Sequence, residues 1–183
     1  MIKLKIYFIA TICGLLLTAN CCKEDTPTVS KVSDQETAEL FAWAVKSSVE
    51  RVAPSSNTQT WSNATVSGYE SGSAVVNGSF TYDYNSYSGR KDEKYNYVVI
   101  QFDKYCDDTY YPHLTGTVII DGTCTTQYGW ETSYWGQWEL VGEDLQLSGK
   151  LSGTASIAMI FKRSGLDWAA IVETADGTWS MSN

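Results

Sequence analysis

The segment 128–138 holds the side chains best suited to binding a ligand, with the sequence Tyr-Gly-Trp-Glu-Thr-Ser-Tyr-Trp-Gly-Gln-Trp. Exposed Trp and Tyr rings can stack on the apolar faces of sugar rings, and Glu131 and Gln137 could exchange hydrogen bonds with sugar hydroxyls. Core packing is the competing interpretation and the favoured one, because a buried aromatic side chain removes about 150–250 Å² from water. The segment is therefore a candidate binding surface only if some of its rings face solvent.

Strand alternation indicates which of these rings are exposed, since successive side chains of a strand point to opposite faces. One face then holds Trp130, Tyr134 and Trp138. Trp135 lies on the opposite face. If Trp130 and Trp138 point into the core, Trp135 points outward and is the best single candidate for contact with a partner.

Two cysteines, Cys106 and Cys124, could form a disulfide in an oxidising compartment. A hairpin that turns at residues 107–112 would, however, pair Cys106 with His113 and Cys124 with Tyr95. The thiols would then lie roughly 36 Å apart at about 3.3 Å per residue, whereas a disulfide needs Cα atoms about 6 Å apart. A disulfide therefore requires the two segments to pair in another way, and the sequence leaves both arrangements open.

Catalytic and metal-binding motifs give little support to an enzyme. His113 is the only histidine, and a catalytic triad would need a nucleophile and a carboxylate that converge on it. No Gly-x-Ser-x-Gly, Cys-x-x-Cys, His-Glu-x-x-His or phosphate-binding glycine loop occurs. Asp103, Asp107 and Asp108 lie around one turn, but their spacing is not that of a calcium loop. We therefore expect no enzyme activity, metal or cofactor, and a small hydrolase is the weakest alternative.

Charge and composition exclude other classes of protein. The chain of 183 residues has 13 Lys and Arg against 21 Asp and Glu, a net charge of −8. This acidity argues against nucleic-acid binding, which needs clustered basic side chains. Aromatic residues make up 13% of the chain, which is too many for a disordered protein.

The first 22 residues have the pattern of an export signal, with a basic start, an apolar run over residues 6–17 and two cysteines at the end. A transmembrane anchor would need about 20 apolar residues. A cysteine at this place resembles bacterial lipoproteins, in which cleavage precedes a cysteine that becomes lipidated. Lys-Glu-Asp at 23–25 resembles the tag of Bacteroidetes-type surface lipoproteins. The resemblance implies an exported protein that a lipid anchors to the outer membrane, exposed at the cell surface.

The lipidated position is either Cys21 or Cys22. If Cys22 carries the lipid, Cys106 and Cys124 remain as an even pair. If Cys21 carries it, Cys22 is left as an odd thiol. A cysteine is rare immediately before a cleavage site, which favours Cys21. We give Cys21 a slight preference and keep Cys22 as the alternative.

A polar tether and a helix are predicted to follow the signal. Residues 23–33 are mostly polar, as expected for a tether between lipid and domain. A helix is predicted over about 34–52, where apolar residues recur at helical spacing and Ser33 or Asp34 could cap its first turn.

Residues 58–183 are predicted to be β-rich and to form, with the helix, a single domain over 34–183. Apolar and polar residues alternate along segments such as 73–85 and 114–124, as in strands with one face in water. The connections are too short for crossover helices, so neighbouring strands should pair antiparallel. We expect a mainly β antiparallel meander of about 8–9 strands preceded by one helix, in the form of a sandwich, a roll or a partly closed barrel. The pattern resembles uncharacterised bacterial envelope proteins of the β-meander kind.

The favoured function is a non-catalytic, lipid-anchored envelope protein that serves as an interaction or structural module. The alternative is a glycan-binding surface lipoprotein that uses the aromatic segment 128–138. The expected partners are the membrane, through the lipid, and either a glycan or another envelope protein, but not nucleic acid.

Overall fold

The structure, a computed structural model, describes residues 29–183 and contains one helix and nine strands. The predicted signal 1–22, with Cys21 and Cys22, lies outside the described residues. The elements are β1 Ser30–Lys31, α1 Gln35–Val52, β2 Gln59–Ser67, β3 Ser71–Asn85, β4 Arg90–Cys106, β5 His113–Gln127, β6 Ser133–Ser148, β7 Leu151–Lys162, β8 Asp167–Thr174 and β9 Gly177–Ser182. Within residues 29–183, no helix is long and apolar enough to cross a membrane.

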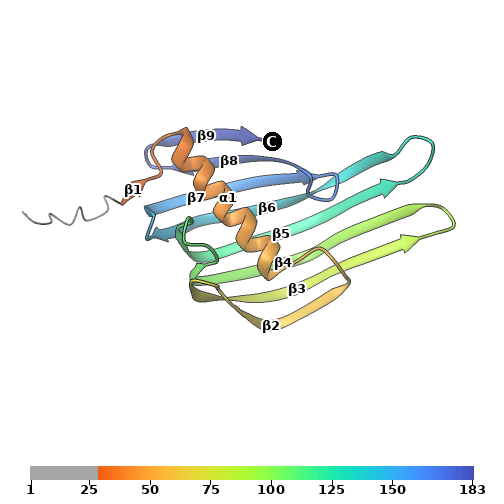
Figure 1. Cartoon of the computed structure of the whole chain (residues 1–183), viewed down its shortest axis with the longest axis horizontal. Helices are drawn as coiled ribbons and strands as arrows, with labels where there is room; N and C mark the ends of the chain where they lie inside the picture. Colours follow the sequence, from red (N-terminus) through yellow and green to blue (C-terminus); the bar gives the residue numbers. More distant parts are fainter. Residues whose placement is uncertain (1–28) are drawn as a thin grey trace, which may run out of the picture.

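Strands β2 to β9 form one antiparallel sheet in which each strand pairs with its neighbours in the sequence. The sheet is open, with β2 and β9 as its outer strands, and α1 lies across one face (Figure 1). The prediction of a mainly β antiparallel meander preceded by one helix is confirmed. The sequence left open a sandwich, a roll or a partly closed barrel, and the structure shows instead a single sheet that is not closed, with α1 across its apolar face.

The short strand β1 brings the start of the described chain onto the sheet. It pairs in parallel with the first two residues of β7, and Val32, the next residue, is buried. The hydroxyl of Thr174 donates a hydrogen bond to the carbonyl of Val32 at 3.4 Å. The interpretation of residues 23–33 as a polar tether therefore needs correction at residues 30–32, which dock on the sheet.

Helix α1 begins after Asp34, which closes a capping box with Thr37. The Thr37 amide donates to Asp34 Oδ1 at 2.8 Å, and the Asp34 amide donates to the Thr37 hydroxyl at 3.3 Å. The structure thus selects Asp34 over Ser33 as the cap. The apolar stripe of the helix faces the sheet, where Phe41 and Val45 have no exposed surface.

Four strand residues other than glycine adopt a left-handed backbone, and each marks a bulge in the sheet. In each case the amide of the bulged residue donates to a side chain on the neighbouring strand, at 2.8–3.0 Å. The pairs are Asn63 with Asn77, Tyr97 with Asp121, Lys104 with Thr115, and Asp144 with Ser156. Bulges bend strands and increase their twist, so these polar side chains help to set the curvature of the sheet around α1.

The bulge at Lys104 allows a matched test of this arrangement. Lys104→Gly is expected to raise the free energy of unfolding by up to about 1 kcal/mol, because glycine adopts the left-handed backbone without the steric cost of a Cβ. Thr115→Val removes the acceptor of the Lys104 amide and is expected to lower the free energy of unfolding by about 1 kcal/mol. Urea titrations of both variants would check this. Destabilisation by the glycine, or no cost from the valine, would contradict the proposed role of the bulge.

Candidate binding surface on the two long hairpins

Most of the exposed aromatic side chains in residues 29–183, seven of eleven, gather at the ends of the hairpins β3–β4 and β5–β6. In Figure 1 both hairpins extend beyond the remaining strands and beyond α1. Seven exposed aromatic residues of these extensions, called the hairpin surface below, are Tyr82, Tyr84, Tyr87, Tyr128, Trp130, Tyr134 and Trp135. Concentrations of exposed apolar area on a soluble domain mark contact surfaces.

On the face that carries α1, a row of paired residues crosses four strands of the hairpin surface. In strand order, the row consists of Tyr84, Lys91, Thr126 and Tyr134. The Tyr84 ring meets the Tyr128 ring edge-on, with centroids 6.3 Å apart. At the other end, the guanidinium of Arg163 lies 4.8 Å from the centroid of the Tyr134 ring. Tyrosines therefore border a polar centre on this face.

An ion pair between Lys91 of this row and the buried Glu93 supports the row. Lys91 Nζ lies 2.8 Å from the carboxylate of Glu93, which is buried and also accepts a hydrogen bond from the Ser164 hydroxyl. Burial alone would lower the pKa of Lys91, but the hydrogen bond and charge of Glu93 outweigh it and raise the pKa above its ordinary value. The Glu93 carbonyl accepts from Trp138 Nε1 at 3.0 Å. These contacts fasten the turn between β7 and β8 to β4 and join β4 to β6.

The opposite face of the hairpins carries Trp135, which pairs with Thr125 across β5 and β6. The guanidinium of Arg90 lies 5.9 Å from the Trp135 ring and forms an ion pair with Asp92 at 2.8 Å. The Thr125 hydroxyl donates to the same carboxylate at 2.5 Å. Burial alone would raise the pKa of Asp92, but the bonds from Thr125 and Arg90 outweigh it and lower the pKa. Trp135 thus sits on an ordered polar base.

A step in the sheet forms a recess at the edge of β6. Pairing of β6 with β7 begins at Trp138 and Phe161, so residues 133–137 of β6 pair with β5 alone. The recess beside this edge, called the corner recess, has a volume of about 700 Å³. Its lining consists of Tyr134, Trp135, Gly136, Gln137, Lys162, Arg163 and Asp167.

The four aromatic candidates of segment 128–138 have different environments. Trp130 is 102% exposed in the turn between β5 and β6, so strand alternation does not apply to it. Tyr134 and Trp135 are 41% and 46% exposed on opposite faces of β6. Trp138 is only 3% exposed and belongs to the core, so its assignment as a ligand-binding residue needs correction. Its buried ring has no free face for a ligand.

Sequence reasoning missed the residues that approach segment 128–138 from elsewhere. Tyr82 and Tyr84 continue the alternation of their strand beyond Phe80, the last buried residue of β3. A run of tyrosines after the aliphatic positions could have signalled an exposed extension. No local pattern indicates Arg163 and Asp167. They lie about 30 residues later in the chain, in the β7–β8 turn and at the start of β8, and only the fold brings them to the recess beside β6.

The cysteines Cys106 and Cys124 are buried and free. Cys124 pairs with Glu93 rather than Tyr95, because the bulges at Lys104 and Tyr97 each shift the register by one residue. The length of β4 from Glu93 to Cys106 is roughly 40 Å at about 3.3 Å per residue, so the disulfide that the sequence left open is not formed. Burial raises the pKa of both thiols above its ordinary value.

His113 and Cys106 line a second recess of about 410 Å³, together with Glu70 and Lys150. The Cys106 thiol donates to the carbonyl of Asp108 at 3.1 Å, and its raised pKa keeps it protonated at neutral pH. Nucleophilic cysteines need the opposite shift, because the thiolate is the reactive form. The pair therefore lacks the features of an activated nucleophile.

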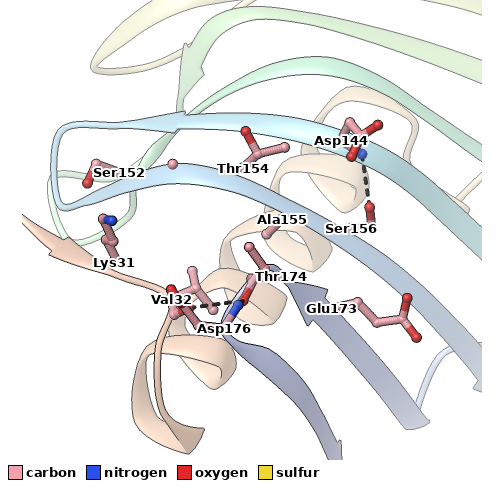
Figure 2. Close-up of a pocket in the computed structure, with 12 residues that line it drawn as sticks. Lys31, Val32, Asp144, Ser152, Thr154, Ala155, Ser156, Glu173, Thr174 and Asp176 are labelled. Carbon is pink, nitrogen blue, oxygen red and sulfur yellow. Dashed lines mark hydrogen bonds between the residues drawn. The ribbon is translucent and has the colours of Figure 1, made fainter.

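A third recess, of about 480 Å³, lies where β1 and the β8–β9 turn meet β7 (Figure 2). Its charged side chains are those of Lys31, Asp144, Glu173 and Asp176. Some of its polar groups already bond one another, since the Asp144 amide donates to the Ser156 hydroxyl at 3.0 Å. Nowhere in residues 29–183 do three or more His, Cys, Asp or Glu side chains form a group that could hold a metal ion.

Comparison with known proteins adds no assignment to these surfaces. Family models, curated proteins and solved structures were each searched, and none matches this chain.

Proposed function

We propose that this chain is a non-catalytic protein of the bacterial cell envelope, that a lipid on Cys21 or Cys22 anchors it to the outer membrane, and that its hairpin surface contacts an envelope partner. The anchor is supported by the export pattern of residues 1–22 and by Lys-Glu-Asp at 23–25. Surface exposure follows from the resemblance of that tag to Bacteroidetes-type surface lipoproteins.

The observation that carries the binding role is the gathering of seven exposed aromatic residues on two hairpins that extend beyond the core. Exposed Trp and Tyr cost free energy in water unless a partner covers them, and both are enriched at interfaces. The ion pair of Lys91 with the buried Glu93 and the Ser164 contact hold the base of the hairpins. A rigid base lets loops and strand ends present side chains to a partner at low entropic cost.

The non-catalytic assignment is supported by the state of the candidate nucleophiles. Burial raises the pKa of both free thiols, and the thiol that lines the same recess as His113 donates to a carbonyl. The hairpin surface, in contrast, offers stacking and hydrogen bonding. These are the means of binding rather than of bond cleavage.

Trp135→Ala tests the binding role. The variant is expected to weaken binding of the full-length protein, purified in detergent, to the envelope fraction of its own cells by roughly tenfold, or about 1.4 kcal/mol. Its thermal midpoint should stay close to that of the wild type, because the ring is half exposed. Tyr69→Ala is the matched control, since Tyr69 is exposed at the opposite end of β3. Heavy destabilisation, or equal losses in both variants, would argue against the proposal.

A further inference from the structure

We propose that the corner recess binds a sugar unit of an uncharged glycan. This inference rests on the proposed function, because the recess lies within the hairpin surface and gives its partner a chemical class. Tyr134 and Trp135 stand on the two faces of the same strand edge and both line the recess. A ligand that enters the step in the sheet therefore meets an aromatic ring on either side.

The polar groups of the recess suit hydroxyl groups. Arg163 and Asp167 form an exposed ion pair with 3.4 Å between nitrogen and oxygen, which offers donors and an acceptor side by side. Gln137 donates to Glu139 at 2.8 Å and keeps its carbonyl oxygen free to accept. A sugar ring combines an apolar C–H face with hydroxyls that both donate and accept. Rings together with paired donors and acceptors match that combination.

The charges around the recess favour an uncharged ligand. Lys162 pairs with Asp167 across β7 and β8, and Arg163 forms an ion pair with the same Asp167. Glu139 accepts a hydrogen bond from Gln137 of the lining. Basic and acidic side chains therefore balance locally. The whole chain carries a net charge of −8, and this field repels polyanions.

A protein strand is a poorer occupant of the same edge. Gly136 lies within residues 133–137, which lack a partner on the β7 side, and its φ of +78° is outside the extended region that a regular ladder requires. A Cβ at this position would lie 2.1 Å from the Thr123 carbonyl oxygen, so the backbone approach of β5 demands glycine here. The irregular edge disfavours the addition of a strand from another protein.

Isothermal titration calorimetry of the full-length protein with defined hexasaccharides tests the inference. The neutral probes are the β-1,4-linked hexamers of glucose, xylose, mannose and N-acetylglucosamine and the α-1,4-linked hexamer of glucose, and the acidic probe is hexagalacturonate. A detergent without a sugar headgroup, such as lauryldimethylamine oxide, avoids competition. At least one neutral hexamer is expected to bind, with Trp135→Ala and Arg163→Gln each weakening it by roughly tenfold and Tyr69→Ala by less than about twofold.

Three results would overturn the inference: no neutral hexamer binds up to roughly millimolar concentration, only the acidic hexamer binds, or the Trp135 and Arg163 variants bind as the wild type does. The proposed function has a separate readout, because binding to the envelope fraction can persist when every sugar fails. Loss of sugar binding with intact envelope binding would point to a protein partner. Failure of both would remove the binding role itself.

Discussion

Phe41→Asp is expected to remove most of the stability of the domain. Phe41 has no exposed surface and lies in the apolar stripe of α1 against the sheet. Loss of a buried aromatic ring costs about 3–5 kcal/mol, and a carboxyl group left there without a partner adds a further desolvation cost. The whole free energy of unfolding of a native protein is only roughly 5–15 kcal/mol. Circular dichroism during heating and urea titration should therefore show a greatly lowered midpoint.

Glu39→Ala is the matched control on the same helix. Glu39 is exposed and accepts only a surface hydrogen bond from Gln35, at 3.0 Å. Its replacement should change stability by no more than about 0.5 kcal/mol. If Phe41→Asp unfolded at the same midpoint as this control, the helix would not be part of the core.

Loss of membrane attachment is expected when Cys21 and Cys22 are both replaced by serine. Lipid addition requires a cysteine, so the double variant should appear in the soluble fraction or retain its uncleaved signal. Cys13→Ser is the control, since Cys13 lies upstream in the apolar run. Fractionation and intact mass would distinguish these outcomes, and the two single variants would show which cysteine carries the lipid. A double variant that is cleaved and still membrane-bound would exclude lipidation.

The meander was accessible from sequence because two physical patterns agree. Alternation of apolar and polar residues marks strands with one buried face, and short connections force neighbouring strands to pair antiparallel. The helix was equally clear, since its apolar stripe ends near Pro54 and either Ser33 or Asp34 could cap its first turn, although only the structure shows that the cap is Asp34. Both signals are local, and neither depends on the neighbours of an element in space.

The bulges and the binding surface depended on contacts that no local pattern contains. The left-handed residues Tyr97 and Lys104 look like ordinary strand positions, and their closing partners Asp121 and Thr115 lie on the next strand. The sequence also placed Trp130 wrongly, on the same strand face as Trp138. Trp130 lies in the turn between β5 and β6, so the alternation of side chains along β6 does not apply to it.

The corner recess shows the same limit. Arg163 reaches Tyr134 because β7 ends beside Trp138, so that the following turn lies next to residues 133–137 of β6, which have no β7 partner. Strand lengths, rather than residue types, create that step. Aromatic density pointed to segment 128–138. The structure adds that Trp138, where pairing with β7 begins, is buried, and that Trp135, beyond the end of β7, is half exposed.

Hydroxyl-radical labelling of the full-length protein, with and without its envelope fraction, tests the binding role most directly. Radical oxidation reports the exposure of individual aromatic side chains, and in the free protein Trp130 is fully exposed and Trp135 is half exposed. Reduced oxidation of these two tryptophans, with unchanged oxidation of Tyr69 and Tyr110, is the expected result. Unchanged oxidation of Trp130 and Trp135 in the presence of the envelope fraction would contradict the assignment of the hairpins as the contact surface.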